Sequence, residues 1–205
     1  MTRSYAVIAV LLVSLMLGVM AYFVYFGRPD DPFADCRNTR IAAGSSAIGG
    51  PFTLVNKLGQ TVTDKDVLTK PSLIYFGYTY CPDICPADSA RNAEAVDILA
   101  ARGLDVTPVF ISIDPERDTP EVVGTFTEYM SEKMVGLTGS PEQVKAASQA
   151  YKTYYRKNGE GEDYLMDHST FTYLTLPKHG FVDIFRRDMP ADKMADAVAC
   201  FIDKS

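Results

Sequence analysis

An uninterrupted apolar segment runs from Tyr5 to Phe26 without a single charged residue. At a rise of about 1.5 Å per residue, a helix of this length reaches about 33 Å, enough to cross the hydrocarbon core of a bilayer. A cleavable signal peptide has a shorter apolar core, about 7–15 residues, and ends in small residues, whereas this segment ends in aromatic ones. The sequence therefore predicts a transmembrane helix within residues 1–28.

The charges flanking this helix predict its orientation. Arg3 and the terminal amine favour a cytoplasmic amino terminus, although Arg28 on the other flank reduces the difference. We therefore expect a single-pass protein of the inner (cytoplasmic) membrane with its carboxyl-terminal domain on the periplasmic side. Beyond residue 28 the net charge is about −8. An acidic domain with few clustered Lys and Arg residues is not expected to bind nucleic acid.

The rest of the chain predicts a tether followed by one folded domain. Residues 29–50 are rich in Gly, Pro, Ser, Ala and Asp and sustain no apolar period, which favours a tether. Within residues 51–205, continuous apolar runs indicate buried strands, and apolar residues three to four apart indicate helices. Strands are expected at 52–55, 60–63, 72–78, 106–113, 171–176 and 181–185, a short segment at 134–137, and helices at 86–102, 120–130, 141–151 and from 190. This order predicts an α/β fold, a mixed sheet covered by helices.

Two cysteines stand between a buried strand and a helix start in the segment YFGYTYCPDICP. Cys81 and Cys85 therefore lie beyond the carboxyl end of a strand, where proteins of this class bind ligands. The N–H groups and the positive dipole end of the helix favour thiolates, so we expect both pKa values to be lowered. Three intervening residues let both sulfurs converge on one ion, which favours chelation. A reversible disulfide would compete with metal binding.

A third ligand is expected on a neighbouring loop, because two thiolates seldom complete a metal site. The chain contains only two histidines. His168 is the better candidate because it directly precedes the strand 171–176, whereas His179 lies in a polar hairpin turn and is expected to be structural. A Cys, Cys, His set suits Cu(I) in trigonal geometry or Cu(II) with an added oxygen ligand. Zinc, which prefers a fourth ligand, stays an alternative.

Four segments carry a resemblance to a known family: GGPFTLVNKLGQTVT, YFGYTYCPDICP, ISIDPERDTP and DHSTFTYL, in this order. In these segments, which cover nearly the whole predicted domain, the chain resembles the Sco/SenC family of copper proteins. The resemblance implies a thioredoxin-like fold with Cys81, Cys85 and His168 as ligands of one copper ion. It also implies a membrane-anchored metallochaperone that delivers copper to the copper A site of cytochrome c oxidase subunit II, or to another copper-accepting protein.

Two other functions would use the same residues. In a thiol-disulfide oxidoreductase, one of the two cysteines would attack a disulfide of the acceptor and the other would resolve the mixed disulfide. A redox or copper sensor would signal the same states to a partner. His168 separates these functions, since a reductase could lose it with little effect and a copper carrier could not. Whether the chain is an enzyme stays open, because copper transfer requires no bond-breaking catalysis.

The same resemblance implies a role for one acidic residue, Asp118, and shows one departure from the family pattern. Asp118, in the segment DPERDTP, falls where the family carries an acidic residue near the site. This position implies a supporting role, either a hydrogen bond to His168 or control of access to the ion. The chain departs from the commoner family pattern at Ala87-Asp88, a change expected to leave the ligands untouched and to alter the docking face.

The remaining cysteines, Cys36 and Cys200, lie in the predicted tether and in the last helix. At 100° per residue, Cys200 falls on the helix face opposite the apolar stripe of Met194, Val198, Phe201 and Ile202. It is then accessible to another segment of the chain. We hypothesise a disulfide between Cys36 and Cys200 that pins the tether to the domain, with two free thiols as the alternative.

Overall fold

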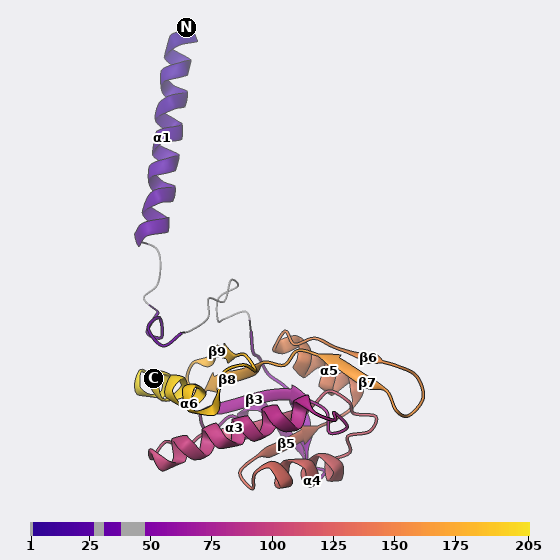
Figure 1. Cartoon of the computed structure of the whole chain (residues 1–205). Coiled ribbons are helices and arrows are strands. Elements are labelled where there is room, and N and C mark those ends of the chain that lie inside the picture. The colour runs from indigo at the N-terminus through magenta and orange to yellow at the C-terminus, as the bar shows by residue number, and fades with distance from the viewer. Residues whose placement is uncertain (1, 27–30, 38–47) are drawn as a thin grey trace. The chain divides into compact units, whose positions relative to one another are not determined.

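The computed structural model describes residues 2–26, 31–37 and 48–205. It divides into two compact units, Met1–Ala34 and Asp35–Ser205. The first contains helix α1 (Thr2–Phe26), the long helix of Figure 1. Its segment Tyr5–Phe23 has a mean hydropathy of 2.6, and none of that segment is buried inside the protein. By length and composition, α1 is therefore suited to cross a membrane, as the sequence predicts.

The second unit is built on a seven-stranded mixed sheet (Figure 1). Its three middle strands, β5, β4 and β3, are parallel, and antiparallel strands flank them on both sides. The order across the sheet is β2 (Thr61–Thr63), β1 (Thr53–Asn56), β5 (Val135–Thr138), β4 (Thr107–Ser112), β3 (Ser72–Gly77), β8 (Thr172–Leu176) and β9 (Gly180–Phe185).

Helices connect the strands and cover the sheet: α2 (Asp64–Val67), α3 (Ile84–Ala101), α4 (Pro120–Met130), α5 (Pro141–Ala150) and α6 (Ala191–Asp203). The parallel strands are joined through α3 and α4, as expected for an α/β fold. Helix α3 packs beside α6, and α5 packs against β1. Helices α4 and α5 each begin with a capping hydroxyl, on Thr119 and Ser140, followed by a proline.

Strand β3 positions the cysteine segment. All six of its residues are buried, as predicted from its continuous apolar run, and it pairs with β4 on one side and β8 on the other. The strand ends at Gly77 and α3 begins at Ile84. The cysteine segment therefore forms the loop at the carboxyl end of a central strand, where α/β proteins bind ligands.

The predicted mixed sheet with flanking helices is confirmed, but the sequence reading missed three short elements. One is α2, and the others are β6 (Tyr155–Asn158) and β7 (Leu165–His168), which form a separate two-stranded antiparallel sheet. Their sequences, YRKN and LMDH, are short and rich in polar residues, so they show little apolar alternation. His168, expected in a loop, is consequently the last residue of a strand.

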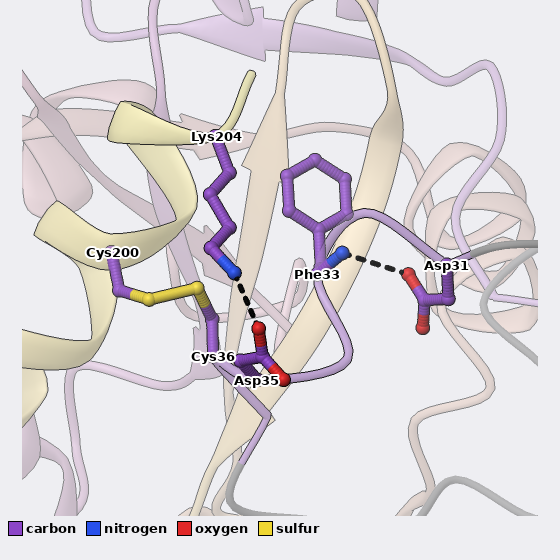
Figure 2. Close-up of a disulfide and its surroundings, with 6 residues drawn as sticks. All are labelled: Asp31, Phe33, Asp35, Cys36, Cys200 and Lys204. Atoms are coloured by element: carbon purple, nitrogen blue, oxygen red, sulfur yellow. Dashed lines mark hydrogen bonds and ion pairs between the residues drawn. A yellow bond between two sulfur atoms is a disulfide. The ribbon is translucent and has the colours of Figure 1, made fainter.

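A disulfide joins Cys36 to Cys200 of α6 (Figure 2). The two residues are 164 positions apart in the sequence. Beside the disulfide, the Lys204 ammonium lies 2.8 Å from the Asp35 carboxylate. The hypothesised connection is thus present in this structure, and the chain is fixed to the domain at Cys36. The limits of the tether, 29 and 50, stay a prediction, because residues 27–30 and 38–47 lie outside the described part.

Candidate metal centre

The loop after β3 brings two sulfurs to the amino end of α3. Cys81 lies in this loop and Cys85 in the first turn of the helix. The backbone N–H of Cys85 donates to the Cys81 Sγ at 3.3 Å, so the helix start holds the first sulfur directly. Both cysteines are buried and free of disulfides. Gly77 leaves the space for them, since a Cβ at this position would lie 3.1 Å from the Cys85 Sγ.

The two thiols differ in acidity. Hydrogen bonds from the Cys85 side chain and from N–H groups at the helix start lower the pKa of Cys81 from 9.0 to about 5. The neighbouring Cys81 sulfur, followed by burial, raises the pKa of Cys85. The expectation of two lowered pKa values is therefore wrong for Cys85, because a second negative charge beside the first is unfavourable. At neutral pH the metal-free pair holds one thiolate and one thiol, and the thiol must lose its proton to bind a metal.

His168 approaches the cysteines from the β6–β7 hairpin. Its Nε2 lies 3.4 Å from the Cys85 Sγ, and its Nδ1 lies 2.8 Å from the backbone carbonyl oxygen of Ser169. A carbonyl oxygen can only accept, so Nδ1 carries the proton in this hydrogen bond and Nε2 keeps the lone pair that a metal requires. The rings of Tyr75 and Tyr78 stand nearly perpendicular to the imidazole, at centroid distances of 6.2 and 5.8 Å, and fix its orientation.

Together, Cys81, Cys85 and His168 offer three ligand atoms within 4.8 Å of one another. Metal bonds of about 2.0–2.3 Å to nitrogen and sulfur bring ligand atoms roughly 3.6–3.8 Å apart, so small movements place all three on one ion. Two of these residues, Cys81 and His168, line an open cleft of about 430 Å³. This soft donor set suits copper, and it would hold zinc if a fourth ligand completed the tetrahedron.

Comparison with known proteins assigns this chain to a family. The family model described as SCO1/SenC matches residues 41–203, which include all three candidate ligands. The chain belongs to the SCO1/SenC family. It is 53% identical over 203 residues to Protein SenC of Rhodobacter capsulatus, covering 98% of this chain and 91% of that protein. It is 45% identical to the mitochondrial SCO1 homolog 1 of Arabidopsis thaliana over 77% of this chain, but spans only 48% of that relative.

Solved structures of the family share the fold. The crystal structure of Arabidopsis thaliana ScoI with copper bound matches with a TM-score of 0.73 and 43% identity, covering 77% of this chain and 99% of that chain. BsSco, described as a member of the Sco family of cytochrome c oxidase assembly proteins with a disulfide switch, matches with a TM-score of 0.61 and 26% identity, covering 74% and 91%. These similarities confirm the thioredoxin-like fold.

Asp118 holds the cysteine loop of this SCO1/SenC protein and does not contact His168. Its buried carboxylate accepts hydrogen bonds from the Thr79 N–H at 3.1 Å, the Thr79 hydroxyl at 2.5 Å and the Ser112 hydroxyl at 2.5 Å. Burial raises the pKa of this carboxyl group. The expected hydrogen bond to His168 is not formed within the described residues, because the imidazole N–H points to the Ser169 carbonyl. Asp118 instead fixes the loop two residues before Cys81.

A chain of buried polar groups behind Cys85 was not predicted. The Tyr75 hydroxyl lies 3.8 Å from the Cys85 Sγ and 3.1 Å from the Asp88 carboxylate, which in turn lies 3.7 Å from the Arg91 guanidinium. Asp88 is 3% exposed, so its carboxylate lies behind the ligands, whereas Ala87, the other half of the departure from the family pattern, is exposed. Only the spacing of Asp88 and Arg91, about one helical turn apart, could have indicated the ion pair.

His179 and Met166 are not part of the three-residue group. His179 lies in the turn between β8 and β9 and lines a different cavity. Its backbone N–H donates to the Leu176 backbone carbonyl. Met166 borders the metal cleft, but only 9% of it is exposed and it packs with the hydrophobic core. Within the described residues, the group that can hold a metal is therefore Cys81, Cys85 and His168.

Proposed function

We propose that this protein is a membrane-anchored carrier that binds one copper ion through Cys81, Cys85 and His168 and delivers it to the copper A site of cytochrome c oxidase subunit II. The SCO1/SenC family serves copper delivery and cytochrome c oxidase assembly, which supports the general role. The observation that carries the proposal is the convergence of two sulfurs and one imidazole nitrogen within 4.8 Å at an open cleft.

The arrangement suits release as well as capture. Three protein ligands leave a coordination position open on a copper ion, and the cleft gives an incoming ligand access to it. Acceptor ligands can then replace the protein's ligands one at a time. The Ser169 carbonyl keeps His168 in the tautomer that binds metal, and the helix start supplies one thiolate before the ion arrives.

The carrier is proposed to be held at the inner membrane by α1, with the unit Asp35–Ser205 on the periplasmic side. The apolar segment Tyr5–Phe23 supports the membrane attachment. The disulfide between Cys36 and Cys200 supports a location outside the cytoplasm, because such bonds persist in oxidising compartments.

Anaerobic copper titration tests the carrier function. The full-length chain in detergent, with Cys81 and Cys85 reduced, is titrated with Cu(I) and with Cu(II) beside three variants: Cys81→Ala, His168→Ala and the control His179→Ala. The wild type and the control should bind one ion per chain in either oxidation state. Cys81→Ala should abolish binding of both, and His168→Ala should weaken Cu(II) binding by at least about tenfold. No copper binding by the wild type, or tighter binding of zinc than of copper, would refute the proposal.

A thiol-disulfide oxidoreductase is the second candidate, favoured by the pKa of Cys81, about 5, beside a protonated Cys85. The Cys81 thiolate would attack an acceptor disulfide, forming a mixed disulfide and releasing one acceptor thiolate. Cys85 would then lose its proton and attack the Cys81 sulfur, releasing the second acceptor thiol and leaving Cys81 and Cys85 oxidised. His168→Ala should leave this reduction rate unchanged while abolishing copper delivery. A redox or copper sensor would use the oxidised, reduced and copper-bound states of the same three residues to signal to a partner protein.

A further inference from the structure

The Arg117 guanidinium lies between the two segments that carry the metal ligands. Its central carbon is 3.5 Å from the centroid of the Tyr164 ring, next to β7, and 4.6 Å from that of Tyr80, next to Cys81. It donates to the Asp114 carboxylate at 2.6 Å and to the backbone carbonyl of Glu162 at 3.1 Å. One side chain from the loop after β4 therefore contacts both the cysteine loop and the loop that joins β6 to β7.

The β6–β7 hairpin needs such an anchor. It forms its own two-stranded sheet, and among the described strands none of the main sheet pairs with it. An isolated hairpin of two short strands is marginally stable in water, so side-chain contacts must fix its position. Tyr164 is one such contact: its ring is 5% exposed and its hydroxyl donates to the Asp114 carboxylate at 2.6 Å.

Arg117 makes a partly buried, charge-assisted hydrogen bond and stacks on an aromatic ring, and both contacts are stronger than an exposed ion pair. Its side chain is only 14% exposed and Asp114 is 3% exposed, so their hydrogen bond is shielded from water and salt. The planar guanidinium also stacks on an aromatic face while directing N–H donors sideways, which an ammonium group cannot reproduce. By contrast, Lys157 lies 3.7 Å from the centroid of the same Tyr164 ring but is 45% exposed and pairs only with the exposed Glu116.

We propose that Arg117 is a positioning residue that clamps the hairpin carrying His168 against the loop carrying Cys81, and so sets the distance between the imidazole and the two sulfurs. The expected effect on copper binding rests on the proposed function. The anchoring of the hairpin by Arg117 does not depend on it. His168 is four residues beyond Tyr164, at the other end of β7, where it pairs with Tyr155. Loosening the loop end of the hairpin is therefore expected to let β7 shift as a whole and carry the imidazole Nε2 away from the Cys85 Sγ, which lies 3.4 Å from it.

Amide hydrogen exchange of the metal-free, full-length chain in detergent tests the clamp without copper. Arg117→Lys keeps the charge and removes the planar donor fork, and Arg117→Gln removes the charge as well. Both should speed exchange in residues 155–158 and 165–168 by at least about tenfold while leaving β3 and β4 unchanged. Lys157→Met, the matched control on the same ring, should leave exchange unchanged. Wild-type exchange in the hairpin of both Arg117 variants, or equal acceleration in all strands, overturns the proposal.

Copper titration then measures the consequence for the site. Arg117→Lys should weaken Cu(II) binding, which depends on His168, by about 10–100-fold, and weaken Cu(I) binding by the two sulfurs much less. Equal losses for both ions, or none, would contradict a role in placing His168. If the wild type binds no copper, the proposed function fails, while the exchange experiment still decides whether Arg117 holds the hairpin.

Discussion

Gly77→Ala should damage both the fold and the metal site, because the methyl group has no space. The added carbon would lie 2.7 Å from a ring carbon of Tyr75, 3.0 Å from one of Phe110 and 3.1 Å from the Cys85 Sγ. Overpacking of this kind costs about 1–3 kcal/mol. For a protein of this size each kcal/mol lowers the Tm by about 2–4 °C, so we expect the Tm to fall by roughly 2–12 °C.

A second glycine offers a matched control. A methyl group at Gly136, in β5, would lie 2.8 Å from the Thr127 Oγ1 and from the Val123 Cγ1, and it has no metal ligand among its nearest neighbours. Thermal unfolding of the full-length chain in detergent, followed by circular dichroism, should show similar losses for Gly77→Ala and Gly136→Ala. Only Gly77→Ala should also weaken copper binding, by about 10–100-fold. Equal copper affinities in the two variants would refute the steric argument.

Four further outcomes are expected. Acidification of the reduced, metal-free chain should protonate Cys81 with a midpoint near pH 5, seen as loss of thiolate ultraviolet absorbance; a midpoint near the ordinary value of 9.0 would contradict the geometry of the helix start. Because the folded pKa lies below the unfolded one, the free energy of unfolding should rise from about pH 5 to pH 9, and Cys81→Ser should flatten that rise. Replacing Cys36 and Cys200 by serine should cost about 2–5 kcal/mol in urea unfolding, since the crosslink spans 164 positions, and an unchanged midpoint would argue against the bond. Asp118→Ala should cost about 1–3 kcal/mol by leaving the donors of Thr79 and Ser112 unpaired; a stability equal to that of Asp118→Asn would contradict this.

The parts of the fold that could be predicted from the sequence are those with strong apolar patterns. The run of Ser72–Gly77 is buried on both faces, and helices α4 and α5 each start at a capping hydroxyl followed by a proline. These local signals were sufficient for the order of the main sheet's strands along the chain. The hairpin β6–β7 could not be predicted in this way, because contacts distant in sequence, such as Arg117 with Tyr164, help to hold its polar strands in place.

In the candidate metal site, too, features set by neighbouring residues could be predicted from the sequence, whereas features set by distant contacts could not. The placement of Cys81 and Cys85 follows from a strand, a loop and a helix start that are adjacent in the sequence. The inequality of their pKa values does not, because it depends on which sulfur receives the N–H donors of the helix. Of the two roles expected for Asp118, a hydrogen bond to His168 is not formed in the described part of the chain, since a carboxylate can bond whichever donors the fold brings near it, here Thr79.

The bond between Cys36 and Cys200 limits the length of chain that can extend between helix α1 and the sheet domain. Ten residue steps separate the end of α1 at Phe26 from Cys36, and fully extended they reach about 35 Å. Among the described residues, the next backbone hydrogen bond to the domain after Cys36 runs from the Gly49 N–H to the Ala150 carbonyl, and a fully extended chain from Phe26 to Gly49 would reach about 80 Å. A single covalent bond to α6 thus shortens the longest possible link between α1 and the sheet domain by more than half.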